Sequence, residues 1–193
     1  MNFSKNLKRL MLVSSLVICA LAYNVQQPKV VYPEEVQVKT VQSAQSQLTF
    51  RRLDVPMDSV LQEWTYDLCW RHKIDFTLIM AMIKQESNFR PDAISSTNDY
   101  GLMQINIINH HWLREKFGIT DFCDPYANIV AGVFMVKELF KKYPEPGKML
   151  MAYHMGEEGA AKFWKRGIFE SHYSKSVLAQ KKAYEKEIRG EHQ

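Results

Sequence analysis

The sequence predicts a mostly α-helical domain that follows an apolar N-terminal segment and a linker. Apolar residues recur at helical spacing in successive segments from residue 56 onward. The same region shows no convincing alternating strand pattern and no internal repeat. The chain has 193 residues, of which 46% are hydrophobic. That is enough to bury one core without metal or disulfide staples.

Residues 1–22 have the pattern of an export signal. Basic residues and no acid precede an unbroken apolar stretch, LMLVSSLVICALA, which ends in the small-x-small pattern of a cleavage site. The stretch is short for a stable membrane span. We therefore predict a secretory signal peptide, with an uncleaved signal anchor as the alternative. Both place the rest of the chain outside the cytoplasm, and we expect membrane contact only through this segment.

The charge of the chain argues against a nucleic-acid partner. The formal net charge is +4 and much of it lies in residues 1–22, so the rest of the chain is nearly neutral. A nucleic-acid-binding domain usually has a denser basic surface.

The adjacent His110 and His111 would point about 100° apart on a helix. The sequence also has no His-Glu-x-x-His motif, so no metal site is expected.

Residues 23–55 are predicted to form a linker. They are rich in Gln, Val, Ser and Pro, and they show no sustained helical period. As a spacer, this segment would hold the rest of the protein away from the membrane. The predicted folded domain is then 56–193.

Each predicted helix has its own signal. MDSVLQEWTYDLCWRHK places its apolar residues on one face. Asp75 is the expected N-cap of the next helix, DFTLIMAMIKQE, and a further apolar run covers 100–118. Asp124-Pro125 predicts another helix start. KMLMAYHMGEEGAAKFWKRG predicts two helices joined by a glycine bend, and SKSVLAQKKAYEKEI predicts a last amphipathic helix.

One carboxylate, Glu86, falls where the pattern predicts buried residues. On a helix that turns about 100° per residue, Glu86 lies between Met82 and Ile79 inside the apolar arc. It also lies in the last turn, where the helix dipole disfavours negative charge. Burial and dipole both raise the pKa of a carboxyl group, and an acid that keeps its proton near neutral pH is a general acid. The alternative is an ion pair with Arg90.

Further motifs follow Glu86 in a fixed order. Glu86-Ser87 precedes Pro91-x-Ala93, then Ser95, then GLMQI at 101–105. DPYANIVAG, MAYHMG and FESHY come later in the chain. Together these blocks resemble the SLT-type lytic transglycosylases of the goose-type lysozyme superfamily over roughly residues 58 to 180. The resemblance implies a lysozyme-like helical domain in 56–193.

The resemblance also implies an activity. Lytic transglycosylases cleave the β-1,4 bond between MurNAc and GlcNAc in peptidoglycan and leave 1,6-anhydro-MurNAc ends. Family members use one glutamate, here Glu86, as acid and then as base, with no cofactor. The N-acetyl group and the 6-hydroxyl of the same sugar complete the reaction, so no second carboxylate is required. Small single-domain members often accompany secretion, conjugation or phage machinery, which makes such an apparatus a partner to expect beside the glycan strand.

By the same resemblance, seven further residues are expected to contact substrate. Met103 would form an apolar wall beside the sugar, and Glu170 would order or bind at the floor of the site. His154 stands where the family usually has Asn; an imidazole can donate one hydrogen bond but brings its own pH dependence. The full set is Ser95, Met103, Gln104, Tyr153, His154, Glu170 and Tyr173.

Three questions stay open at this point. Asp99 lies on the loop that returns toward Glu86. It is either a residue that only stabilises the local turn or the second carboxylate of a lysozyme-type hydrolase. A non-catalytic cell-wall-binding or assembly protein on the same scaffold is a further alternative. Cys69 and Cys123 are either a disulfide or two small buried side chains.

Overall fold

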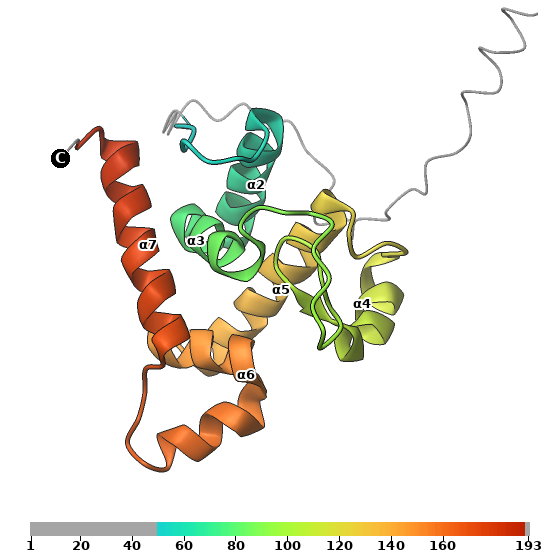
Figure 1. The fold of residues 1–193 in the computed structure, drawn as a ribbon, viewed down its shortest axis with the longest axis vertical. Helices are drawn as coiled ribbons and strands as arrows, with labels where there is room; N and C mark the ends of the chain where they lie inside the picture. Colours follow the sequence, from blue (N-terminus) through green and yellow to red (C-terminus); the bar gives the residue numbers. More distant parts are fainter. Residues whose placement is uncertain (1–49, 192–193) are drawn as a thin grey trace, which may run out of the picture. The chain divides into compact units, whose positions relative to one another are not determined.

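The computed structural model describes residues 50–191, and α-helices carry most of them (Figure 1). Between α3 and α4 lie two short strands and a 3-10 helix, η2 (Ile107–Asn109). This confirms the predicted mostly helical body. Within 50–191, no helix is both long and apolar enough to cross a membrane. The α-helices are α2 (Ser59–His72), α3 (Phe76–Ser87), α4 (His110–Phe117), α5 (Pro125–Lys142), α6 (Pro146–Trp164) and α7 (His172–Arg189).

Acidic side chains cap the starts of three helices. Asp58 accepts hydrogen bonds from two backbone N–H groups at the start of α2. Asp75 does the same for α3, and Asp124 caps α5 with Pro125 at its first position. These caps satisfy N–H groups for which the helix itself offers no acceptor. The predicted starts at Asp75 and Asp124 are confirmed.

The predicted glycine bend interrupts α6. Gly156 has φ 74° and ψ 159° inside an otherwise helical segment, a conformation that glycine adopts far more readily than other residues. After the bend, Glu157 contacts Lys142 and Tyr143 at the end of α5. The bend therefore joins the second half of α6 to α5.

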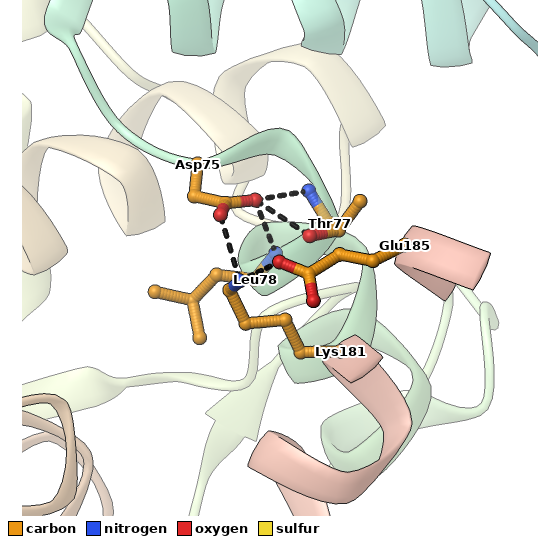
Figure 2. Close-up of polar contacts among 5 residues, drawn as sticks. All are labelled: Asp75, Thr77, Leu78, Lys181 and Glu185. Carbon is orange, nitrogen blue, oxygen red and sulfur yellow. Dashed lines mark hydrogen bonds and ion pairs between the residues drawn. The ribbon is translucent and has the colours of Figure 1, made fainter. Parts of the chain in front are cut away.

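Helix α7 packs along α3 in the antiparallel direction. The start of α7 reaches the end of α3, because Tyr173 bonds Glu86. Further along α7, Lys181 Nζ lies 2.8 Å from Asp75 Oδ2 at the start of α3 (Figure 2). Lys181 also pairs with Glu185 one turn later on α7. The last turn of α3 is thereby held against α7.

The hairpin between α3 and α4 corrects the expectation of a body without strands. β1 (Asp99–Tyr100) and β2 (Ile105–Asn106) are antiparallel, with Asp99 opposite Asn106 and Tyr100 opposite Ile105. Strands of two residues are too short to show the alternation by which a strand is recognised in a sequence. The apolar run 100–118 therefore divides into the hairpin, η2 and the short helix α4.

The first described residues pack onto the helices. Leu53 is fully buried, and its backbone exchanges hydrogen bonds with the buried Gln62 side chain of α2. The ring of Phe50 lies edge-on to Phe76, with centroids 6.0 Å apart. This end of the predicted linker thus contributes to the core. The segment 1–22 and the linker up to residue 49 lie outside the described residues.

The two cysteines of the helical body are free thiols. Cys69 is buried in α2, where burial and the nearby Asp75 raise the pKa of its thiol. Cys123 is partly exposed just before α5. Of the two alternatives that the sequence left open, the structure has the unpaired cysteines.

Candidate active site

A cleft of about 880 Å³ opens beside the end of α3. It contains the carboxylates singled out above, Glu86 and Asp99, together with side chains from the hairpin region, α4, α5 and α6. Its lining residues include Glu86, Ser95, Thr97, Asp99, Gln104, Asn106, Trp112, Met135, Glu138, Leu139, Lys142, Tyr153, His154, Gly156 and Glu157.

Glu86 lies in the last turn of α3, partly exposed at the cleft wall. Tyr173 Oη donates a hydrogen bond of 2.5 Å to its Oε1. Burial raises the pKa of Glu86 to about 7; the Tyr173 bond opposes the rise, and the negative charge of Asp99 adds to it. Arg90, the cation of the ion-pair alternative, instead donates to the backbone oxygen of Ser87 at 3.2 Å. Burial therefore keeps the proton on Glu86 up to a higher pH than on an exposed glutamate.

The chain turns sharply after Glu86 and Ser87. Asn88 and Phe89 both have left-handed backbone angles, with φ of 51° and 64°. The N–H of Asn88 bonds the carbonyl of Lys84 and ends α3, and the Phe89 side chain is buried. These two residues fix Glu86 as nearly the last residue of the helix.

Asp99 carries a fixed negative charge on β1. Ser95 Oγ and Thr97 Oγ1 donate to its Oδ2 at 2.6 and 2.5 Å, and Asn106 Nδ2 donates to its Oδ1 at 2.7 Å. Partial burial disfavours the ionised form. The three hydrogen bonds and the nearby His154 outweigh it and hold the pKa of Asp99 below its ordinary value. Ser95 lines the cleft as expected, but its hydroxyl is engaged with Asp99.

His154 lies flat against Tyr173, the donor to Glu86. The two rings are 4.2 Å apart between centroids and nearly parallel, at 6°. Desolvation lowers the pKa of His154, and the charge of Asp99 opposes this without cancelling it. The imidazole thus loses its proton at a lower pH than an exposed histidine does, and it forms part of the cleft wall.

Tyr153 and Gln104 also line the cleft, and their hydroxyl and amide groups donate hydrogen bonds to backbone carbonyls in and near the hairpin. Tyr153 Oη donates to the backbone oxygen of Met103 at 2.9 Å. Gln104 Nε2 donates to the carbonyls of Ala93 and Gly101 at 3.1 and 2.8 Å. Both residues therefore support the wall as well as face the cleft.

Three of the expected substrate contacts, Met103, Glu170 and Tyr173, do not line the cleft. Met103 is fully buried and packs against Gly132 of α5, where an added Cβ would meet its sulfur at 2.1 Å. It supports the wall from behind. Glu170 is exposed in the loop before α7, beside Gly147 at the start of α6. Tyr173 is buried as well and acts on the site through its bond to Glu86.

Asn128 is a positioning residue that the sequence analysis missed. Its buried side chain accepts from the N–H of Met103 at 2.7 Å and donates to the carbonyls of Tyr100 and Phe122 at 2.8 and 2.7 Å. These bonds tie the hairpin to α5. The available signal was an amide inside an otherwise apolar helical segment, because a buried amide needs specific partners.

Helix α4 carries a tryptophan and a histidine with different environments. Among the four tryptophans, Trp112 lines the cleft, with its Nε1 donating to Asn109 Oδ1 at 3.1 Å. Its indole ring is therefore part of the cleft wall. His110 is buried instead, with its Nε2 3.1 Å from the carbonyl oxygen of Ile105 and its ring stacked on Phe122 at 3.6 Å.

Similar sequences occur among transglycosylases and invasion proteins. The "Membrane-bound lytic murein transglycosylase F" of Desulfosudis oleivorans is 39% identical over 75 residues, covering 39% of this chain and 16% of that protein. The "Invasion protein IagB" of Salmonella typhimurium is 28% identical over 121 residues, covering 56% of this chain and 72% of that protein. The chain thus matches a small part of the first relative and most of the second.

A solved structure shares the fold. An inactive mutant of the lytic transglycosylase Slt from Pseudomonas aeruginosa superposes with a TM-score of 0.59 at 20% sequence identity, covering 72% of this chain and 25% of that one. The likeness confirms the predicted fold class, a lysozyme-like helical domain.

The family follows from the extent of the sequence match. A family model described as "Transglycosylase SLT domain" matches residues 67–177, more than half of the chain. That range includes Glu86, the hairpin with Asp99, and both His154 and Tyr173. The chain belongs to the transglycosylase SLT domain family.

Proposed function

We propose that this chain is an exported peptidoglycan lytic transglycosylase that cleaves the MurNAc–GlcNAc β-1,4 bond and leaves 1,6-anhydro-MurNAc ends. The observation that carries the proposal is Glu86, a carboxyl group whose pKa is raised to about 7 in a cleft of about 880 Å³. Membership of the family and the names of the relatives support the same activity.

In this mechanism Glu86 takes part in two proton transfers. It donates its proton to the glycosidic oxygen as the bond from C1 breaks, and the N-acetyl group of MurNAc stabilises the positive charge at C1. The Glu86 carboxylate then takes the proton of the 6-hydroxyl, whose oxygen bonds to C1 and closes the ring. Glu86 ends protonated by the former 6-hydroxyl proton, its first proton leaves on the 4-hydroxyl of GlcNAc, and no water is consumed. The Tyr173 hydrogen bond stabilises the carboxylate between the two steps.

The products and one variant test this proposal. We expect peptidoglycan treated with the purified protein to release muropeptides lighter by one water than those that end in a reducing sugar. Glu86→Gln should lower the cleavage rate by at least about a thousandfold while circular dichroism and glycan binding stay as in the wild type. Cleavage by Glu86→Gln at a rate near that of the wild type would show that Glu86 is not the acid.

A lysozyme-type hydrolase is the second candidate, and Asp99 is the observation that favours it. Asp99 shares the cleft with Glu86, stays ionised and adds to the raised pKa of Glu86. A fixed anion of this kind can stabilise positive charge at C1. Three hydrogen bonds to its oxygens fit a stabilising anion better than a base. Reducing-end products, together with a large loss of rate in Asp99→Asn, would establish hydrolysis in place of ring closure.

The location and partners form part of the same proposal. The signal pattern of residues 1–22 supports export to the cell envelope, where the glycan lies. The relative named as membrane-bound supports an envelope location, and the proposed partner remains a secretion, conjugation or phage apparatus. A non-catalytic wall-binding protein would bind glycan and release no fragments, so the product experiment distinguishes it as well.

A further inference from the structure

The end of α6 and the loop that follows it expose both apolar and basic side chains. In Figure 1 this part of the chain projects from the rest of the helical body. Phe163 is 39% exposed, Ile168 37% and Phe169 47%, and a group of exposed apolar side chains marks an interaction site more often than a single one does. We call this surface the tip patch, and its members are Lys162, Phe163, Lys165, Arg166, Ile168 and Phe169.

Backbone hydrogen bonds bring two apolar members of the tip patch together. The N–H of Ile168 donates to the carbonyl of Phe163 at 3.1 Å, and the N–H of Gly167 donates to the carbonyl of Trp164 at 2.9 Å. Gly167 has φ 74°, which lets the chain fold back over the end of the helix. Phe163 and Ile168 therefore lie close together although the helix ends between them.

Trp164 attaches the tip patch to the helical body. Its ring packs on that of Tyr143, just after α5, with centroids 4.7 Å apart. On the other side of the loop, Lys148 Nζ lies 4.9 Å from the centroid of the Phe169 ring. The exposed side chains are thus presented on a packed helix end.

The basic members of the tip patch are free to bind an anion. Within residues 50–191, Lys162, Lys165 and Arg166 take part in no ion pair. By contrast, Lys142 and Lys148 each pair with a glutamate. Residues 159–169 contain the three basic residues of the patch and no acid.

The two acids that flank this segment do not pair with its cations. Glu158 precedes it and Glu170 follows it, and neither takes part in an ion pair within the described chain. Glu170 lies against the start of α6, since a Cβ added at Gly147 would be 3.9 Å from its Oε1. A helix start favours a negative charge beside it, so Glu170 has a role there.

An anionic phospholipid surface matches the combination of charges and apolar groups in the tip patch. Its phosphates can bind the lysine and arginine side chains, and the acyl boundary just beneath them can receive the phenylalanine and isoleucine side chains. The long basic side chains can reach the phosphates while the apolar ones lie deeper. An acidic protein surface would match the cations but has no apolar layer beneath its charges.

We propose that the tip patch docks on the anionic surface of a phospholipid bilayer, with its apolar members entering the interface and its basic members binding phosphates. This adds a second membrane contact to the one predicted for residues 1–22, and it does not depend on the proposed activity. Glu157, at the start of the same half of α6, lines the cleft, so docking keeps the cleft near the membrane.

Hydrogen exchange of the full chain on lipid vesicles tests the docking. One set of vesicles contains phosphatidylcholine alone, and the other contains equal parts of phosphatidylcholine and phosphatidylglycerol. The exchange of the backbone amides of residues 162–170, followed by mass spectrometry, reports on the tip patch itself, even where residues 1–22 hold the chain on both kinds of vesicle. We expect exchange at least about fivefold slower on the anionic vesicles, because each basic side chain near an anionic surface strengthens binding by about that factor.

A charge variant and a matched control separate the tip patch from general attraction to the membrane. The charge variant combines Lys162→Gln, Lys165→Gln and Arg166→Gln. The control removes the same number of charges from exposed lysines of α7 that take part in no ion pair within the described residues, and it combines Lys175→Gln, Lys182→Gln and Lys186→Gln. We expect the charge variant to exchange on anionic vesicles as the wild type does on phosphatidylcholine, and the control to stay protected.

Three outcomes would overturn the docking. They are equal protection of the charge variant and the control, equal protection of the wild type on both kinds of vesicle, and no protection on either, which would favour an acidic protein as the partner. If circular dichroism shows that the charge variant is misfolded, the wild type decides alone. Salt of about 1 M shortens the Debye length to about 3 Å and must remove the protection; protection that persists overturns the proposal.

Discussion

At the scale of single residues, the pKa of Glu86 is set by its burial and by two nearby side chains, Tyr173 and Asp99. Burial raises the pKa of Glu86, Tyr173 lowers it and Asp99 raises it again. Tyr173 can only act as a donor, because burial and the nearby Glu86 raise the pKa of its phenol well above the ordinary value. The ring of His154 stacks on that phenol. The acid is thus tuned through Tyr173.

This arrangement predicts a pH profile. Glu86 must hold its proton to start the reaction, so kcat/KM should fall as the pH rises through about 7. Tyr173→Phe removes a hydrogen bond that stabilises the carboxylate, so the pKa of Glu86 should rise. We expect the alkaline limb of the profile to move to higher pH by about one unit, measured on soluble glycan strands.

Tyr184→Phe is the control for that profile. Tyr184 is also a buried tyrosine of α7, but it takes no part in the Glu86 hydrogen bond. Its profile should match that of the wild type. An alkaline limb that stays in place in Tyr173→Phe would mean that the limb reports a group other than Glu86.

At the scale of elements, α3 and α7 are joined at both ends of their contact. Tyr173 and Glu86 meet at one end, and Lys181 and Asp75 meet at the other (Figure 2). Asp75 has two tasks there, since it caps α3 through backbone N–H groups and pairs with Lys181. Partial burial opposes its ionisation, but the bonds from Lys181 and Thr77 hold the pKa of Asp75 below its ordinary value.

The two tasks of Asp75 can be separated by substitution. Asp75→Ala loses the cap and the pair, and we expect it to lower the free energy of unfolding by about 1–2 kcal/mol. Asp75→Asn keeps the cap and should recover most of that loss. Because the folded pKa is lowered, the ionic contribution is present above the unfolded pKa and is lost as the pH falls through the folded pKa. Urea unfolding at neutral and at acid pH measures the capping and the ionic contributions separately. Equal losses of stability in Asp75→Ala and Asp75→Asn would contradict a stabilising contribution from the cap.

At the scale of the molecule, the core includes residues that precede the first described helix. Leu53 is fully buried, and its backbone is bonded to the buried Gln62. Asp54 and Arg51 reach the far end of α7, at Glu187 and the carbonyl of Ile188. The segment before α2 therefore connects the two ends of the described chain.

This connection predicts a large effect at a position that the sequence suggests is linker. Leu53→Ala should lower the free energy of unfolding by about 3 kcal/mol, because it leaves a cavity in the core. Val60→Ala, at a side chain 64% exposed on α2, should change it by less than about 0.5 kcal/mol. Chemical denaturation of the two variants measures the difference. If Leu53→Ala is as stable as the wild type, residues 50–55 belong to the linker and do not contribute to the core.

The sequence by itself determined the features that arise within a few residues. The caps at Asp75 and Asp124, the bend at Gly156 and the burial of the Glu86 face all follow from local backbone geometry and helical periodicity. The ordered motifs around Glu86 indicated the family before any contact was known. These signals are readable because cause and effect lie on the same turn or helix.

Only the tertiary structure decided which side chains meet in the cleft. Tyr173 bonds Glu86 across 87 positions of sequence, and Asn106 can donate to Asp99 only because β1 and β2 pair. Met103 went into the core and Glu170 to an exposed loop, although the motifs suggested substrate contacts for both. A motif fixes a residue's type and position in the chain. The direction its side chain faces depends on how distant elements pack around it, and that packing is a property of the whole fold.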